Sequence, residues 1–335
     1  MECLDPRVGV PCYKWSEKQH CKVFAYKILK SAKNFFSQLD CSARSAQDYL
    51  NDYPDFYDLE GNLKKPLLIR CGQCINCRLE QSRQWAMRMS LEKIEYRSDQ
   101  CWFVTLTYSD DNLHVVKGDL ATCRMDDISE FMKRLRAYFA EKYGLDGVRF
   151  YAATEYGDQT FRPHGHMILY GCPVPDVKVS PIDSNYYQSE LLEKLWQHGN
   201  VVLAEVSFED CAYTARYVTK KITGKRYEEE YKPYGIEQEK SRMSRMPGIG
   251  MFYFDPEIYG QVEKAVGPGR IFKRCAAFDR KMKDLNPVIY EELKKEAQKV
   301  VDLRLKAEPV TRSFAQRLDV LADYAASQKK YKGNF

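Results

Sequence analysis

The sequence predicts an α+β fold, in which an antiparallel sheet has helices on one face. Two observations predict this class. Segments rich in β-branched and aromatic residues alternate with segments whose apolar residues recur at helical spacing. Their order along the chain, β-α-β-β-α-β-α, suits the split βαβ or ferredoxin-like plan. We expect this domain at residues 67–255, between an irregular N-terminal arm at 1–66 and a helical C-terminal extension at 256–335.

The first half of the predicted domain contains a helix, a strand and a second helix. Residues 82–96 have apolar side chains at helical spacing, and residues 101–108 read CWFVTLTY, which is typical of a strand. The segment 126–144 has one apolar stripe, an acidic start and a terminal glycine, which indicate a helix. Because side chains alternate along a strand, one face of 101–108 should join the core, while Thr105 and Thr107 line a polar cleft.

The second half of the predicted domain continues the alternation, and one further helix is expected on either side of the domain. The expected elements are strands at 148–155, 164–171 and 200–206, and helices at 211–222 and near 186–197, 22–38 and 286–308.

Composition narrows the class of protein. Of the 335 residues 44% are hydrophobic and 30% are charged, which is typical of a soluble globular chain. There is no run of eighteen apolar residues and no signal-peptide pattern, so we expect neither membrane insertion nor classical export. The net charge of +5 permits a phosphate-bearing partner without demanding one. Twelve cysteines in such a chain indicate reduced thiols or metal ligands rather than disulfides.

A histidine pair is the first candidate site. His164 and His166 stand at i and i+2 of a predicted strand, so both imidazoles should project from one face. Two ordinary histidines would produce the same pattern. Glu155 ends the preceding strand, and if the two strands pair, its carboxylate joins the imidazoles. Two imidazoles and a carboxylate with open positions suit Mg²⁺ or Mn²⁺ holding a phosphate oxygen.

Two tyrosines and two lysines form the second candidate site. Tyr213, Tyr217, Lys220 and Lys221 share one face of the predicted helix at 211–222. A nearby ammonium favours the phenolate form of a tyrosine and can neutralise charge on an attacked phosphate. Tyrosine packing with solvated lysines is the competing interpretation.

Three cysteines form a third candidate. Cys71, Cys74 and Cys77 have the C-x-x-C-x-x-C spacing of a zinc knuckle, which needs a fourth ligand. Unligated thiols or an iron–sulfur cluster are the alternatives. The sequence does not choose among the possible fourth ligands, which are Cys3, Cys12, Cys21, Cys41 and Cys101.

Local basic clusters could contact nucleic acid. They lie at 133–136 and 220–226, and the residues that we expect to bind DNA are Lys133, Arg134, Arg136 and Lys225. A solvated surface is the competing interpretation of each cluster.

These motifs, taken in order, resemble a known family. FVTLTY, then EYG and RPHGH, then YTARYVTKK and SRMPGIG are similar to the replication initiators of gokushoviruses, which are bacteriophages of the microvirus family within the His-hydrophobic-His endonuclease superfamily. The Cys-rich segment CGQCINCRLEQSRQWAMR, ahead of FVTLTY, belongs to the same resemblance. The match covers roughly residues 66–255, so the predicted domain at 67–255 would be the endonuclease domain.

The resemblance implies roles for individual residues. His164 and His166 would bind Mg²⁺ or Mn²⁺, with Glu155 as the third ligand. Tyr217 fits the nucleophile, because Tyr217-Val-Thr-Lys220 matches the Y-x-x-K pattern of the family, and Tyr213 fits the second tyrosine of members that have two. The sequence departs from the pattern at Gly165, where a bulky residue is usual, which puts the packing behind the strand in doubt.

The implied activity is metal-dependent nicking of single-stranded origin DNA, which leaves a 5′-phosphotyrosyl enzyme and a free 3′-OH, followed by rejoining. The implied setting is the cytoplasm of a bacterial host. A host polymerase would extend the 3′-OH, and a host helicase would unwind the duplex, because the chain contains no P-loop motif.

Two other classes remain open. The chain could be a non-enzymatic DNA-binding protein stabilised by zinc, in which the histidines are incidental. It could also be a relaxase or a single-strand transposase. Relaxases usually have a third histidine and an early tyrosine, and compact transposases are much shorter, so both comparisons favour replication initiation.

Overall fold

The computed structural model describes residues 7–17, 20–28, 56–64, 67–220, 225–256 and 275–307. The chain divides into two compact units, which are described separately. One comprises residues 1–80 and 297–335, and the other comprises residues 81–296. No helix within the described ranges combines the length and apolar character needed to cross a membrane.

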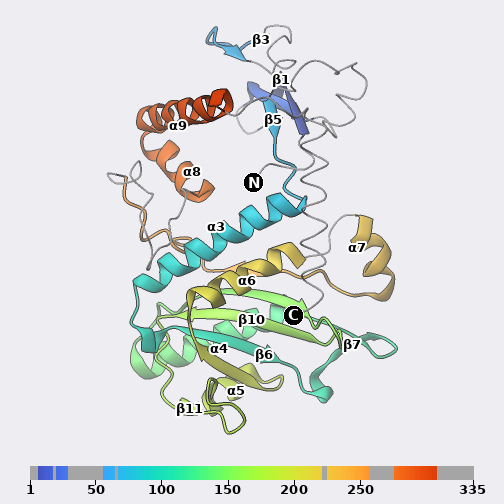
Figure 1. Ribbon diagram of the computed structural model, residues 1–335. Coiled ribbons are helices and arrows are strands. Elements are labelled where there is room, and N and C mark those ends of the chain that lie inside the picture. The colour runs from blue at the N-terminus through green and yellow to red at the C-terminus, as the bar shows by residue number, and fades with distance from the viewer. Residues whose placement is uncertain are drawn as a thin grey trace. The chain divides into compact units, whose positions relative to one another are not determined.

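A seven-stranded sheet organises the unit 81–296, and every pair of neighbouring strands is antiparallel (Figure 1). The strands, in their order across the sheet, are β11 (Lys178–Val179), β12 (Tyr187–Gln188), β13 (Val201–Glu205), β6 (Trp102–Thr107), β10 (Pro163–Tyr170), β9 (Arg149–Tyr156) and β14 (Ser241–Met243). The predicted α+β class and antiparallel sheet are confirmed.

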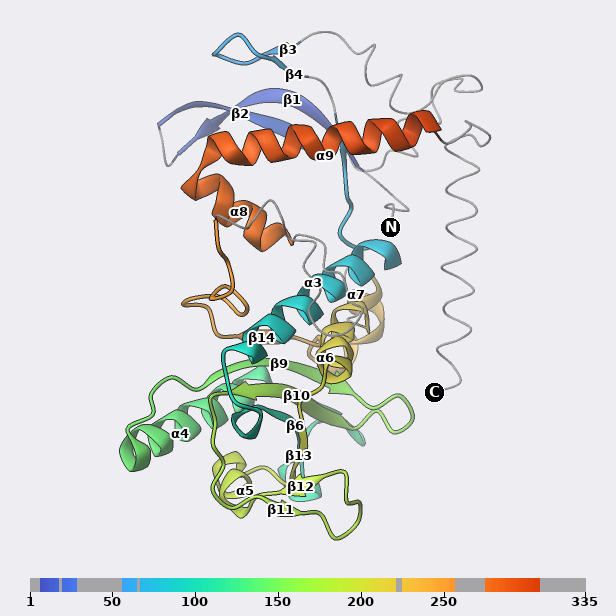
Figure 2. The same ribbon diagram turned by 60° about the vertical axis from the view of Figure 1, so that its left-hand side comes forward.

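Two helices cover the first face of this sheet: α4 (Met125–Tyr143) and α5 (Glu190–Trp196) (Figure 2). The apolar stripe of α4 packs on alternate residues of β6 and β10, including Val104 and Met167. The helix ends where Gly144 adopts a φ of 65°, a left-handed conformation that glycine tolerates. This layer is the one that the sequence predicts.

Two further helices cover the second face: α3 (Ile75–Ile94) and α6 (Phe208–Lys220) (Figures 1 and 2). Met89 of α3 and Ala215 of α6 are buried with Phe103, Ile168 and Tyr170 of the sheet. The prediction of helices on one face is incomplete, because the central strands carry apolar side chains on both faces and each face has to be buried.

The N-terminal segment differs from its prediction. Residues 7–28 form a hairpin of β1 (Arg7–Ser16) and β2 (Cys21–Ile28), which β5 (Leu67–Ile69) extends to three strands. The prediction of an irregular arm is therefore wrong over these residues, and the prediction of a helix near 22–38 is wrong up to residue 28. The rest of that predicted helix lies outside the described residues. Cross-strand pairs such as Tyr13 and Phe24 stabilise the strands instead.

The remaining elements are short or lie toward the C-terminus. They are β3 (Phe56–Tyr57), β4 (Leu63–Lys64), β7 (His114–Lys117), β8 (Leu120–Thr122), α7 (Lys225–Glu230), α8 (Ala276–Leu285), α9 (Pro287–Ala307) and the 3₁₀ helices η1 (Ser98–Gln100), η2 (Asp110–Asn112) and η3 (Lys232–Tyr234). Helix α9 confirms the helix predicted near 286–308.

Candidate metal centre

The predicted metal ligands lie together at one end of the central strands. Strands β9 and β10 pair so that Glu155 stands opposite His164, while His166 stands opposite Ala153. All three side chains therefore project from the same face of the sheet. The Glu155 Oε2 atom lies 3.3 Å from His164 Nε2 and 3.4 Å from His166 Nε2. The hairpin that the sequence only allowed is the element that brings the carboxylate to the imidazoles.

The separations of these atoms fit a shared cation. The three ligand atoms all lie within 4.8 Å of one another. Atoms bound at about 2.1 Å to one ion, at right or tetrahedral angles, stand roughly 3.0 to 3.4 Å apart. Glu155 and His166 are 4% and 6% exposed, and a buried carboxylate requires a positive partner. The group therefore suits a divalent cation.

The other ring nitrogens of the histidines are oriented by neighbouring oxygens. His164 Nδ1 lies 3.1 Å from the carbonyl oxygen of Arg162, so it donates there and turns Nε2 toward Glu155. His166 Nδ1 lies 3.1 Å from the Thr105 hydroxyl, and the imidazole stacks on Phe103 at 5.5 Å between ring centroids. Such contacts orient metal-binding histidines. Thr105 was predicted to line a polar cleft, whereas the stacking by Phe103 was not anticipated.

Gly165 packs against α4 on the opposite face of the sheet. A Cβ atom at this position would stand 2.9 Å from Cδ1 of Ile128. Ile128 thus occupies the space that a side chain between the two histidines would fill. This contact explains the departure from the bulky residue of the family pattern, and it leaves both imidazoles on the metal face.

Helix α6 brings Tyr213 to this centre. The Tyr213 ring lies 5.5 Å from the His166 ring, at an interplanar angle of 81°, and it remains 39% exposed. The guanidinium of Arg216 lies 5.7 Å from the same ring. The backbone of Tyr217 and Lys220 continues the helix, but their side chains and the whole of Lys221 lie outside the described residues.

The four predicted DNA-binding residues have different surroundings. Lys133 is exposed and pairs with Glu130 at 2.6 Å. Arg134 donates to the carbonyl oxygens of Leu195 and Trp196, at the end of α5, and Arg136 donates to that of Val148. The Lys225 side chain lies outside the described residues.

The three cysteines of the knuckle motif also lie together, within the unit that includes residues 1–80. Cys71 Sγ is 4.0 Å from Cys77 Sγ, and it accepts the backbone N–H of Cys74 at 3.2 Å. Two thiolates on one tetrahedral zinc, each at about 2.3 Å, stand roughly 3.8 Å apart. The described part of the chain adds no fourth ligand to this group.

Other cysteines are packed as small apolar residues. Burial raises the pKa of Cys101 to about 11 and those of Cys172 and Cys211 to about 12. These thiols therefore stay protonated near neutral pH. Cys101, one of the proposed fourth zinc ligands, is buried in the core cluster that contains Phe103 and Tyr170.

Comparison with known proteins identifies related chains. The model of a family described as Replication-associated protein ORF2 matches residues 101–222. Replication-associated protein ORF2 of Spiroplasma virus 4 is 34% identical over 235 residues, which are 68% of this chain and 71% of that protein. Replication-associated protein VP4 of Bdellovibrio phage phiMH2K is 33% identical over 174 residues, or 49% of this chain and 52% of that protein.

A third relative, replication-associated protein ORF4 of Chlamydia phage 1, is 30% identical over 244 residues, or 66% of this chain and 59% of that protein. No solved structure matches the chain. The span of the family model includes β6, β9, β10 and α6, which together build the candidate centre. The chain therefore belongs to the ORF2 family of replication-associated proteins, whose similar members come from microviruses, the gokushoviruses among them.

Proposed function

We propose that this protein starts rolling-circle replication by nicking single-stranded DNA at the phage origin. The convergence of Glu155, His164 and His166 beneath a tyrosine-bearing helix is the observation that carries the proposal. It joins a cation-binding group to a potential nucleophile within the span that matches replication-associated proteins.

The chain would hold Mg²⁺ or Mn²⁺ through His164 Nε2, His166 Nε2 and Glu155. A cation bound there would polarise a non-bridging oxygen of the scissile phosphate. Thr105 and the Arg162 carbonyl keep the imidazoles turned toward the ion.

Tyr217 is the proposed nucleophile, and Tyr213 is the proposed second tyrosine for rejoining. The path of α6 supports this choice. Cys211 packs near Tyr170 and Tyr213 packs near His166, so the helix runs toward the His164 end of β10. Four residues of helix advance about 6 Å, and two residues of strand span about 6.6 Å, so Tyr217 follows Tyr213 as His164 follows His166.

In the proposed step, the Tyr217 oxygen loses its proton and bonds to phosphorus as the bond from phosphorus to the 3′ oxygen breaks. The 3′ oxygen takes up a proton and becomes a free 3′-OH, while the 5′ phosphate stays on the tyrosine. Lys220 and Lys221 would favour the phenolate and offset the phosphate charge. Attack by the new 3′-OH on the phosphotyrosine would rejoin the strand.

The proposed setting is the cytoplasm of the infected bacterium. A host DNA polymerase would extend the 3′-OH, and a host helicase would supply unwinding. Both partners follow from the proposed chemistry.

Incubation with circular single-stranded phage DNA and Mn²⁺ tests the proposal. We expect a covalent protein–DNA adduct on a denaturing gel, lost on addition of EDTA and in Tyr217→Phe, with first cleavage largely retained in Tyr213→Phe. An adduct that persists in Tyr217→Phe would refute the nucleophile assignment. DNA binding without any adduct would instead favour the non-enzymatic, zinc-stabilised alternative, which the geometry of the cysteine group keeps in view.

We also propose that Cys71, Cys74 and Cys77 hold a structural zinc ion. Metal analysis of the purified protein should find zinc in the wild type and less of it in Cys74→Ser. A Cys12→Ser variant serves as a matched control, because Cys12 lies in β1 and outside the thiol group. Equal zinc in Cys74→Ser and the wild type would contradict the assignment.

A further inference from the structure

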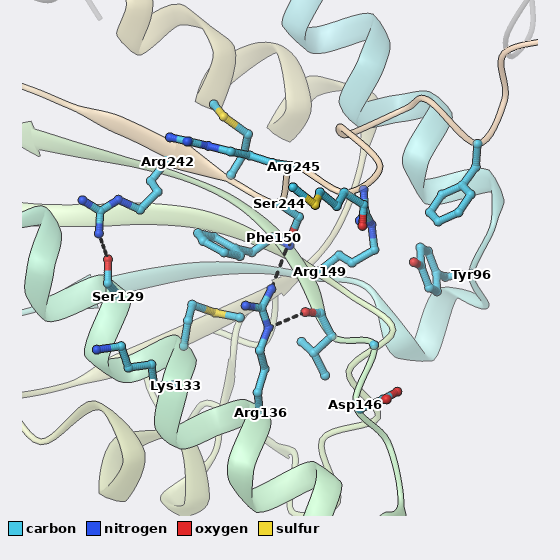
Figure 3. A pocket seen from close by; sticks show the side chains of 16 residues that line it. Tyr96, Ser129, Lys133, Arg136, Asp146, Arg149, Phe150, Arg242, Ser244 and Arg245 are labelled. Atoms are coloured by element: carbon cyan, nitrogen blue, oxygen red, sulfur yellow. Dashed lines mark hydrogen bonds between the residues drawn. The ribbon is translucent and has the colours of Figure 1, made fainter.

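A strongly basic cleft lies away from the candidate metal centre. It has a volume of about 950 Å³ and is lined by α4, the start of β9, β14 and the segment after β14 (Figure 3). Five of its lining side chains are cationic, namely Lys133, Arg136, Arg149, Arg242 and Arg245, whereas Asp146 is the one carboxylate among them. The cleft therefore favours an anionic ligand.

Arg242 and Arg245 are the cations most accessible to such a ligand. The Arg242 side chain is 41% exposed, and its guanidinium contacts the Ser129 hydroxyl and, at 3.3 Å, Asp126. Arg245 is also exposed, and within the described ranges it forms no ion pair. Guanidinium groups bind phosphate through paired N–H donors, which suits them to a phosphodiester backbone.

The segment that carries Arg245 is held by buried contacts with α3. Arg88 Nε donates to the Ile249 carbonyl at 2.8 Å, and the Gly250 N–H donates to Glu92 at 2.6 Å. Gly250 has a φ of +72°, and a Cβ atom there would stand 2.5 Å from the Arg88 carbonyl oxygen. This close approach explains the glycines of the SRMPGIG motif, to which the nicking chemistry gives no role.

The held segment presents apolar side chains to solvent beside the arginines. Met246 is 94% exposed and Phe252 is 51% exposed, and the Arg149 guanidinium lies 5.0 Å from the Phe252 ring. Accessible apolar side chains next to phosphate-binding cations are the combination that binds unpaired bases together with their backbone. Paired bases in a duplex would offer no such faces.

The cleft is separated from the metal centre along the sheet and across it. Six residues of β9 separate Glu155 from Arg149, a span of about 20 Å. Arg242 stands opposite Ala152, on the α4 face, whereas Glu155 projects from the α6 face. A ligand in the cleft would thus be a different stretch of DNA from the one at the metal.

We propose that this cleft, with Arg242, Arg245 and Phe252, is a second site for single-stranded DNA, which retains a strand remote from the nick. The proposal rests on the proposed function in taking DNA as the substrate. Its binding step requires neither the metal nor the tyrosines.

Fluorescence anisotropy with a labelled oligo-dT of about 16 nucleotides, in EDTA, tests the proposal, because single-strand sites extend to about that length. Arg242→Ala/Arg245→Ala should weaken binding at least tenfold and reduce the slope of log affinity against log salt by about 1.4, or 0.7 for each lost phosphate contact. Phe252→Ala should weaken binding with little change of slope. Lys178→Ala/Lys194→Ala removes two charges from other exposed positions and should leave affinity within about twofold.

The same experiments define the outcomes that would overturn the proposal. Unchanged affinity in Arg242→Ala/Arg245→Ala would do so, as would equal competition by polyglutamate, which would indicate an acidic protein partner. Adduct formation on saturating phage DNA should survive in the double variant. If no variant forms an adduct while oligo-dT binding still depends on the arginines, the nicking proposal fails and the cleft proposal stands.

Discussion

The two ends of β9 and β10 both contain a buried carboxylate, but the carboxylates are neutralised differently. At one end Glu92 of α3 pairs with Arg149, its second oxygen accepts the Gly250 N–H, and Arg149 also donates to the Pro247 carbonyl. At the other end Glu155 faces the Nε2 atoms of His164 and His166. The first group contains its own cation, whereas the second gathers ligand atoms around one point.

This difference separates a structural network from a binding site. A buried ion pair with satisfied hydrogen bonds is electrically complete, so it fixes a segment of chain. A carboxylate and two imidazoles directed at one point become complete when a cation joins them. Substitutions at the two ends should therefore affect different properties.

The largest expected effect is on stability, at the Arg149 end. Arg149→Met should lower the free energy of unfolding by about 3 to 5 kcal/mol, because it leaves Glu92 buried without its cation. Urea denaturation measures the loss. The double variant Glu92→Gln/Arg149→Met should regain part of it, and a single variant as stable as the wild type would show that the pair does not hold this end.

Next in size is the effect of Glu155→Gln, which keeps the shape of the side chain and removes its charge. Adduct formation should fall by more than about 100-fold, beyond the range found for residues that only position a metal ligand. Urea denaturation without metal should show a much smaller change than in Arg149→Met. A destabilisation as large as that of Arg149→Met, with adduct formation retained, would reverse the two roles.

Thr105→Val should have an intermediate effect, because it removes the hydroxyl beside His166 Nδ1 and preserves the shape of the strand. We expect Mn²⁺ affinity to drop about 10- to 100-fold. Thr105→Ser keeps the hydroxyl and should bind nearly as well as the wild type. Equal affinities for Thr105→Val and the wild type would argue against a positioning role.

Gly165→Ala should have the smallest effect, a loss of about 1 kcal/mol in stability. Crowding against Ile128 costs roughly 1 to 3 kcal/mol, and the better strand preference of alanine returns part of it. Ile128→Val removes the crowding methyl group, so the double variant Gly165→Ala/Ile128→Val should lose less than the single variants combined. Strict additivity of the single losses would contradict the contact.

The Glu155 end was largely predictable from sequence, and the Arg149 end was not. Alternation along a strand placed His164 and His166 on one face, and a short turn placed Glu155 on the neighbouring strand. Those are local relations. Glu92, Arg149 and Gly250 are far apart in the chain, and β14 joins β9 across more than eighty residues, so no short-range pattern reveals these contacts.

The N-terminal hairpin illustrates another limit. The strand β2 has Phe24, Ala25 and Tyr26 in a row, without the alternation that distinguishes a strand from a helix. Its pairing with β1 decides the conformation, with Tyr13 opposite Phe24. Likewise, the second layer of helices follows from both faces of the sheet being apolar, which becomes clear once the register is known.

Mn²⁺ binding, followed through the electron paramagnetic resonance signal of the free ion, tests the central claim most directly. The wild type should bind one Mn²⁺ per chain at the Glu155 end. His164→Ala/His166→Ala should abolish that binding, and the Glu92→Gln/Arg149→Met variant should retain it. Equal stoichiometry and affinity in the wild type and His164→Ala/His166→Ala would contradict the assignment of this end of the sheet as the metal centre.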